Sequence, residues 1–147
     1  MLPFEADTFD IVINRHASYD LNEVARVLKP GGLFITQQVG GENNRPLTER
    51  LRPEYPPLFP DFYLAAELPK FISAGFEILY SNEALVPLRY LDVGAVVYYA
   101  KAIEWEYPDF SVDNYFPQLR ALYEEWLEKG HIDSREHRFI IAARNNK

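Results

Sequence analysis

The sequence predicts an α/β fold, because three kinds of segment follow one another over residues 9–40. An apolar run with β-branched residues over Phe9 to Asn14 precedes a helical pattern over 20–28, and a second apolar run follows over 33–39. Strands that are buried on both faces of a parallel sheet have this continuous apolar character, and helices connect them. The order therefore predicts two parallel strands joined by a helix.

The connecting helix has a start signal and a stop signal. Asp20 occupies the N-cap position and Glu23 follows three residues later, which is the spacing of a capping box. Pro30-Gly31-Gly32 is expected to end the helix, and Gly40-Gly41 marks a place where the backbone must turn tightly or admit a ligand. Apolar residues recur at helical spacing between these signals: Leu21, Val24, Val27 and Leu28.

A Pro/Arg-rich loop is predicted over residues 42–60, with one helical turn around 47–51. A helix over 64–74 follows, with Pro69 in its first turn and Gly75 at its C-terminal cap. Long loops in compact domains are usually lids, binding segments or linkers. The loop is therefore a candidate ligand-binding segment.

Two further strands are predicted over residues 76–86 and 137–144. The segment between them reads as helical over 93–105 and again over 113–129, where Asp113 is the expected capping residue. The sequence thus predicts a helical cap over residues 93–130, inserted before the last strand.

The composition sets outer limits on the protein class. With 147 residues and 48% hydrophobic content, one domain over residues 1–147 is expected. No apolar window is long enough to span a membrane and the first residues lack a signal-peptide pattern, so a soluble cytoplasmic protein without a membrane partner is expected. The absence of cysteines excludes thiolate metal sites, and no metal is expected. The net charge of −7 argues against a DNA partner.

Several motifs closely resemble the class I S-adenosylmethionine-dependent methyltransferases. They are Leu2-Pro3-Phe4, Phe9-Asp10-Ile11-Val12, Glu23, and Arg26-Val27-Leu28-Lys29-Pro30-Gly31-Gly32. The resemblance implies a partial Rossmann-like sheet, with strands corresponding to the fourth to seventh of the family and an antiparallel last strand. The family's glycine-rich turn and ribose-binding acid would precede Met1, so the resemblance implies the C-terminal half of the catalytic domain. It leaves open whether this chain alone binds S-adenosylmethionine.

Candidate catalytic residues follow the first strand. Ligands of open α/β sheets bind beyond the carboxyl ends of the strands, and the resemblance places the residues at this position beside the sulfonium and its methyl group. The candidates are therefore Asn14, Arg15 and His16. An imidazole titrates near neutral pH and suits proton removal, although His16 could instead bond the backbone. Arg15 could orient an anionic substrate or pair with a carboxylate.

Candidate cofactor-binding residues are Leu2, Pro3, Phe4 and Asn14. The resemblance implies that the first three form an apolar wall for the adenine ring. The alternative is ordinary packing at the entrance of the strand.

Two functional hypotheses follow. The first is a methyltransferase that acts on an unidentified acceptor, expected to be a small molecule, with RNA left open. The second is a non-catalytic fragment, or a binding or oligomerisation module, that has lost the cofactor site. Without further strands beside it, the run 9–14 would be an apolar sheet edge, and such edges tend to pair with another chain. Self-association through this strand is therefore expected.

Overall fold

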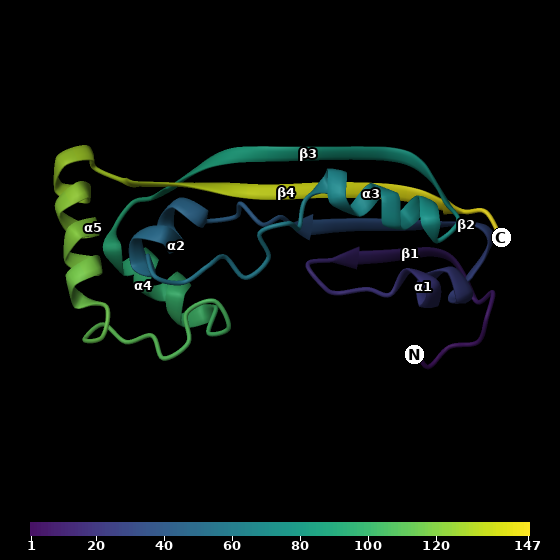
Figure 1. Ribbon diagram of the computed structural model, residues 1–147, viewed down its shortest axis with the longest axis horizontal. Coiled ribbons are helices and arrows are strands. Elements are labelled where there is room, and N and C mark those ends of the chain that lie inside the picture. The colour runs from purple at the N-terminus through teal and green to yellow at the C-terminus, as the bar shows by residue number, and fades with distance from the viewer. The chain divides into compact units, whose positions relative to one another are not determined.

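A computed structural model describes residues 1–147 and shows a four-stranded sheet with the strand order β1-β2-β4-β3 (Figure 1). The strands are β1 (Phe9–Arg15), β2 (Leu28–Val39), β3 (Phe76–Tyr90) and β4 (Ile132–Asn145). β1 pairs with β2 in parallel and β2 pairs with β4 antiparallel. β3 lies on the other side of β4 and runs opposite to it. The predicted α/β class and the antiparallel last strand are confirmed.

Five helices accompany the sheet. They are α1 (Leu21–Val27), α2 (Arg45–Leu51), α3 (Leu64–Ser73), α4 (Val93–Ala102) and α5 (Phe116–Lys129). The predicted helical turn in the Pro/Arg-rich loop corresponds to α2. None of the five helices combines the length and the apolar character needed to cross a membrane.

The boundaries of α1 confirm one expectation and correct two. The Asp20 carboxylate caps the helix by accepting hydrogen bonds from the backbone N–H groups of Asn22 and Glu23. The Glu23 carboxylate does not complete the capping box, because it binds the Leu2 amide and Arg26 instead. The helix ends at Val27, ahead of Pro30-Gly31-Gly32, since Leu28 already pairs with Phe9 in the sheet.

Two other expectations about helices are wrong, although α3 begins at Leu64 as predicted. Pro69 lies inside α3, not in its first turn. At the start of the helix the Glu83 carboxylate accepts a hydrogen bond from the Leu64 amide, 2.7 Å away, and so serves as a cap from outside the helix. Asp113 does not cap α5, whose N-cap is Tyr115 and whose first turn contains Pro117.

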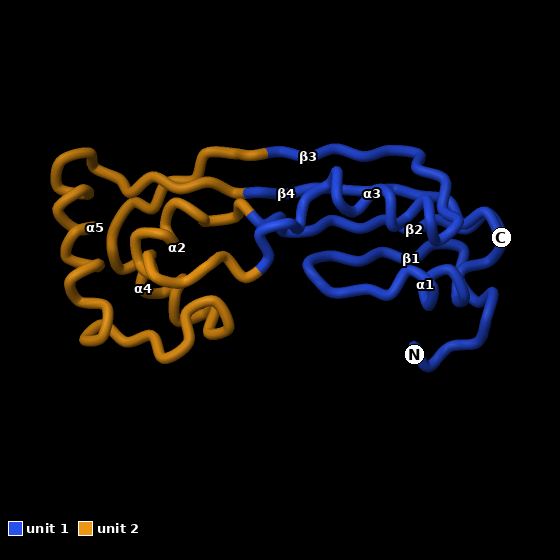
Figure 2. Tube along the Cα trace, in the orientation of Figure 1, with its two compact units in different colours: residues 1–41, 59–84, 137–147 blue, residues 42–58, 85–136 orange.

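The chain forms two compact units, coloured separately in Figure 2. Unit 1 comprises residues 1–41, 59–84 and 137–147, and unit 2 comprises residues 42–58 and 85–136. The two predicted insertions, the Pro/Arg-rich loop and the helical cap, therefore contribute to the same unit. The organisation of residues 1–147 as a single domain stays a prediction.

Each unit has its own core. In unit 1, the fully buried rings of Phe34 and Phe71 stack with their centroids 5.8 Å apart. In unit 2, α2 and α5 contribute to one buried cluster, whose largest fully buried side chain is Tyr107. Four leucines complete the contact between the two helices in that cluster: Leu47, Leu51, Leu119 and Leu122.

A candidate active site at the carboxyl ends of β1 and β2

Asn14 is held by a polar network on the covered face of the sheet. Its side-chain oxygen accepts hydrogen bonds from Thr36 Oγ1 at 3.0 Å and from Gln38 Nε2 at 2.6 Å, and both of these partners are buried. Gln38 Nε2 also donates to the carbonyl of Ala17 at 3.1 Å. This bonding pattern assigns the orientation of the Asn14 amide. Its oxygen faces Thr36 and Gln38 on β2, and its NH₂ group is the branch that these two residues do not contact.

Arg15 and His16 are both exposed at the end of β1. Arg15 donates from Nε to the side-chain oxygen of Gln37, 3.2 Å away, so its partner is an amide and not a carboxylate. The backbone N–H of His16 donates to the Gln37 carbonyl at 3.0 Å, which continues the β1–β2 pairing by one residue. His16 has a φ angle of +53°, a conformation that is unfavourable for residues other than glycine.

The Gly40-Gly41 pair is explained by close packing. A Cβ atom at Gly40 would lie 2.2 Å from the imidazole of His137, and one at Gly41 would lie 2.2 Å from the carbonyl oxygen of Phe59. The backbone N–H groups of both glycines donate hydrogen bonds, to the carbonyls of His137 and Phe62. The Gly40-Gly41 pair was expected either to allow a tight turn or to admit a ligand, and these contacts support the tight turn.

A buried acid that the sequence did not reveal lies near this end of the sheet. Glu67 of α3 is only 4% exposed, and its carboxylate accepts a hydrogen bond from the Tyr19 hydroxyl at 3.0 Å. The ammonium group of Lys70 pairs with the other carboxylate oxygen. Burial, together with the charge of Glu67, raises the pKa of Tyr19 above its ordinary value, so this phenol keeps its proton further into the alkaline range.

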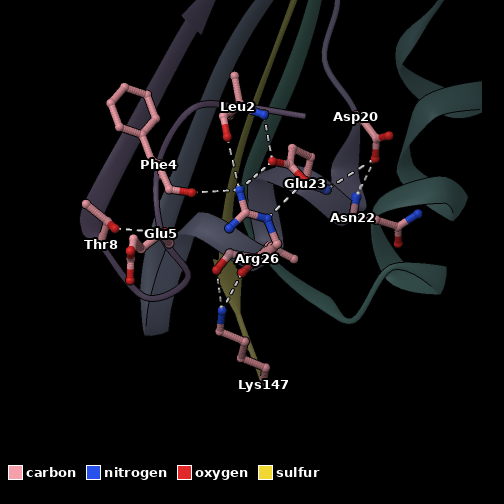
Figure 3. A network of polar contacts seen from close by, with 10 residues as sticks. Leu2, Phe4, Glu5, Thr8, Asp20, Asn22, Glu23, Arg26 and Lys147 are labelled. Atoms are coloured by element: carbon pink, nitrogen blue, oxygen red, sulfur yellow. Dashed lines mark hydrogen bonds and ion pairs between the residues drawn. The ribbon is translucent and has the colours of Figure 1, made fainter.

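The predicted adenine wall is anchored to α1 (Figure 3). The Leu2 amide donates to the Glu23 carboxylate at 2.7 Å, and Arg26 Nη2 donates to the Phe4 carbonyl at 2.9 Å. The Phe4 ring packs edge-on against Phe9 with a centroid distance of 4.9 Å. Leu2 and Phe4 remain 40% and 48% exposed as whole residues.

The structure therefore divides the predicted site residues into two groups with different neighbours. Asn14 contacts β2, whereas the contacts described for Leu2 and Phe4 go to α1 and Phe9. Gln38 lies in the segment 37–41 after the second strand, which the same carboxyl-end rule indicates as a place for ligands. Glu67 was missed, because it lies in an apolar helical segment whose periodicity gives no sign of a buried polar group.

The mixed α/β fold with the strand order β1-β2-β4-β3 matches the fold of solved structures that include a protein assigned as a methyltransferase. No family model and no curated protein matches the sequence. Among solved structures, a protein from Bacillus halodurans C-125 assigned as a methyltransferase has 14% identity and a TM-score of 0.57. The YcgJ protein of Bacillus subtilis has 20% identity and a TM-score of 0.55. Each similarity covers 100% of this chain and 68% of the other chain. A geranyl diphosphate methyltransferase in complex with S-adenosylmethionine has 15% identity, a TM-score of 0.46, and coverage of 99% and 54%. At these identities the first two similarities show the fold alone.

Proposed function

We propose that this chain is part of an S-adenosylmethionine-dependent methyltransferase that acts on a small-molecule acceptor. The proposal rests on the position and direction of β4. This strand lies between β2 and β3 and runs antiparallel to β2. A fold by itself does not fix a function. The exposed polar residues beyond β1, where open α/β sheets bind their ligands, add the second support.

Each predicted site residue has a role in this proposal. Methyl transfer is a displacement at an activated carbon, so the protein aligns the acceptor and removes its proton. The exposed imidazole of His16 accepts that proton, and the guanidinium of Arg15 orients an anionic acceptor. Asn14 faces the cofactor with its NH₂ group, because Thr36 and Gln38 already occupy its oxygen. Leu2, Pro3 and Phe4 form the wall beside the adenine.

Calorimetric titration with S-adenosylhomocysteine tests the cofactor site. We expect saturable binding, and we expect Asn14→Ala to weaken it while His131→Ala, a control in unit 2, leaves it unchanged. Transfer of a labelled methyl group from S-adenosylmethionine is then compared between the low-molecular-mass fraction of a cell extract and its total RNA. Label in the small molecules is the expected result. An absence of binding up to millimolar ligand would contradict the proposal.

A second candidate function is an oligomerisation module, which the edge position of β1 favours. Ile11 and Ile13 are 53% and 75% exposed, although strands of parallel sheets are normally covered on both faces. Antiparallel pairing of two copies centred on Val12 would place Ile11 opposite Ile13 of the second copy. Light scattering at high micromolar concentration tests this candidate. A dimer that Ile13→Lys dissociates is expected, and a monomer at every concentration would rule it out.

A further inference from the structure

We propose that Glu23 and Arg26 are positioning residues for the adenine-binding segment Leu2–Phe4, an inference that rests on the proposed function. Neither side chain is part of the wall. Instead, both bind the backbone of the segment that carries it, while the side chains of Leu2 and Phe4 are left exposed (Figure 3).

Glu23 and Arg26 form a rigid pair on one face of α1. Arg26 Nε lies 3.0 Å from Glu23 Oε2, and Arg26 Nη2 lies 2.6 Å from Glu23 Oε1. A planar guanidinium bound to both oxygens of a carboxylate has a fixed orientation as well as a charge-assisted bond. Glu23 thus aims Arg26 at the segment.

The pair contacts the polar backbone groups at both ends of the segment. Arg26 Nη2 lies 2.9 Å from the Phe4 carbonyl oxygen and 3.3 Å from that of Leu2. The Leu2 amide in turn donates to Glu23 Oε1 at 2.7 Å. The backbone of the segment is therefore held from a single point on α1.

The backbone of Arg26 is itself fixed by residues from both ends of the chain. Its carbonyl oxygen accepts hydrogen bonds from the Asp7 amide at 3.0 Å and from the Lys147 ammonium at 3.1 Å. Lys147 also pairs with the Asp7 carboxylate at 2.8 Å. The part of α1 that holds the segment is thus itself fixed by Asp7 and Lys147.

This arrangement fixes the backbone of two apolar residues without burying their side chains. Packing alone would not require it, since Leu2 and Phe4 would gain more from burial than from exposure. A ligand surface benefits, because a segment that is already ordered loses less conformational entropy when the ligand binds. The positioning role accounts for the fixed backbone and the exposed side chains together.

The test compares Arg26→Lys and Glu23→Gln with the matched control Arg120→Lys. Arg120 forms a similar helical pair with Glu124 on α5, at 3.0 Å, far along the sequence from the segment. Lysine keeps the charge at position 26 but lacks the fork that reaches Glu23 and two carbonyls together. We expect Arg26→Lys to weaken S-adenosylhomocysteine and 5′-methylthioadenosine by the same factor of about ten, because both contain the adenosine group.

Hydrogen exchange of residues 2–8 is measured beside ligand binding. Faster exchange in Arg26→Lys and Glu23→Gln is expected, with Arg120→Lys unchanged in both measurements. Unaltered affinity for both ligands in Arg26→Lys and Glu23→Gln, at temperatures well below their unfolding midpoints, overturns the positioning role whatever the change in stability. Failure of the unmodified protein to bind either ligand overturns the proposed function itself. That outcome is distinguishable, because Arg26→Lys and Glu23→Gln would still show faster exchange although none of the proteins binds a ligand.

Discussion

The hydroxyl of Tyr19 lies 3.0 Å from the carboxylate of Glu67 and donates a hydrogen bond to it. Tyr19 follows β1 and Glu67 belongs to α3, so this bond joins the turn after the first strand to a helix 48 residues further along the chain. The Tyr19 ring also packs edge-on against Phe34 and Phe71. The Tyr19 side chain therefore packs in the core of unit 1 and also supplies a hydrogen bond to the buried carboxylate of Glu67.

Tyr19→Phe should destabilise the protein by about 2 kcal/mol, because it keeps the ring and removes a hydrogen bond to a buried carboxylate. The free energy of unfolding in urea measures this loss. Tyr80→Phe is the control, since Tyr80 is 55% exposed. Equal stability of the two variants would show that Lys70 alone satisfies Glu67.

Glu23 should make stability depend on acid pH. Its hydrogen bonds with Arg26 and the Leu2 amide lower the pKa of the carboxyl to about 2 from an ordinary value of about 4.5. A lowered folded-state pKa contributes stability that is present above pH 4.5 and is lost as the pH falls toward 2. Thermal unfolding of the protein and of Glu23→Gln should therefore differ at neutral pH and converge near pH 2. A constant difference over this range would contradict the assignment.

Glu106 should have the opposite pH dependence. Burial raises the pKa of this carboxyl above its ordinary value, although Thr48 donates a hydrogen bond to it at 2.9 Å. The folded state then favours the protonated acid, so stability is lost as the pH rises through the raised pKa. Glu106→Gln should gain stability relative to the unmodified protein between pH 4.5 and 7, whereas Glu104→Gln, at an exposed position, should not. Parallel pH profiles for the two variants would refute this.

Gly40→Ala should cost about 2 kcal/mol of stability, the range typical of an overpacked core. The new methyl group would overlap the His137 imidazole, which would lie 2.2 Å from it. The double variant Gly40→Ala/His137→Ala should lose less than the sum of the two single variants, because removal of the imidazole makes room. Urea denaturation of all four proteins measures the coupling, and strict additivity would argue against the overlap.

Local signals were sufficient to predict β1, the Asp20 cap and the ends of two helices. Gly75 and Gly130 follow α3 and α5 with φ angles of +86° and +74°, as glycines after helices often do. These features depend on residues close in sequence. The early end of α1 was missed because pairing of Leu28 with Phe9 in the sheet overrides the helical pattern.

The parts of the site that were not predicted depend on contacts between residues distant in sequence. Asn14 was a candidate from its place after β1, but its orientation depends on Thr36 and Gln38, and so on the β1–β2 register. The contacts of Arg26 were hidden in the same way, since its partners Leu2 and Phe4 precede it by 24 and 22 residues. A motif shows which residues occur together but does not show which backbone groups they bind.

Unit 2 is built from two segments that are separate in sequence, and this has a consequence for its folding. Its two segments, 42–58 and 85–136, share one core, and the hydroxyls of Thr48 and Tyr107 lie 2.7 Å apart across 59 residues of sequence. Either segment without the other would expose the leucines of α2 or α5 to water. The two segments are therefore expected to fold only together, and a chimaera that exchanges one of them with a relative should fold only when it exchanges both.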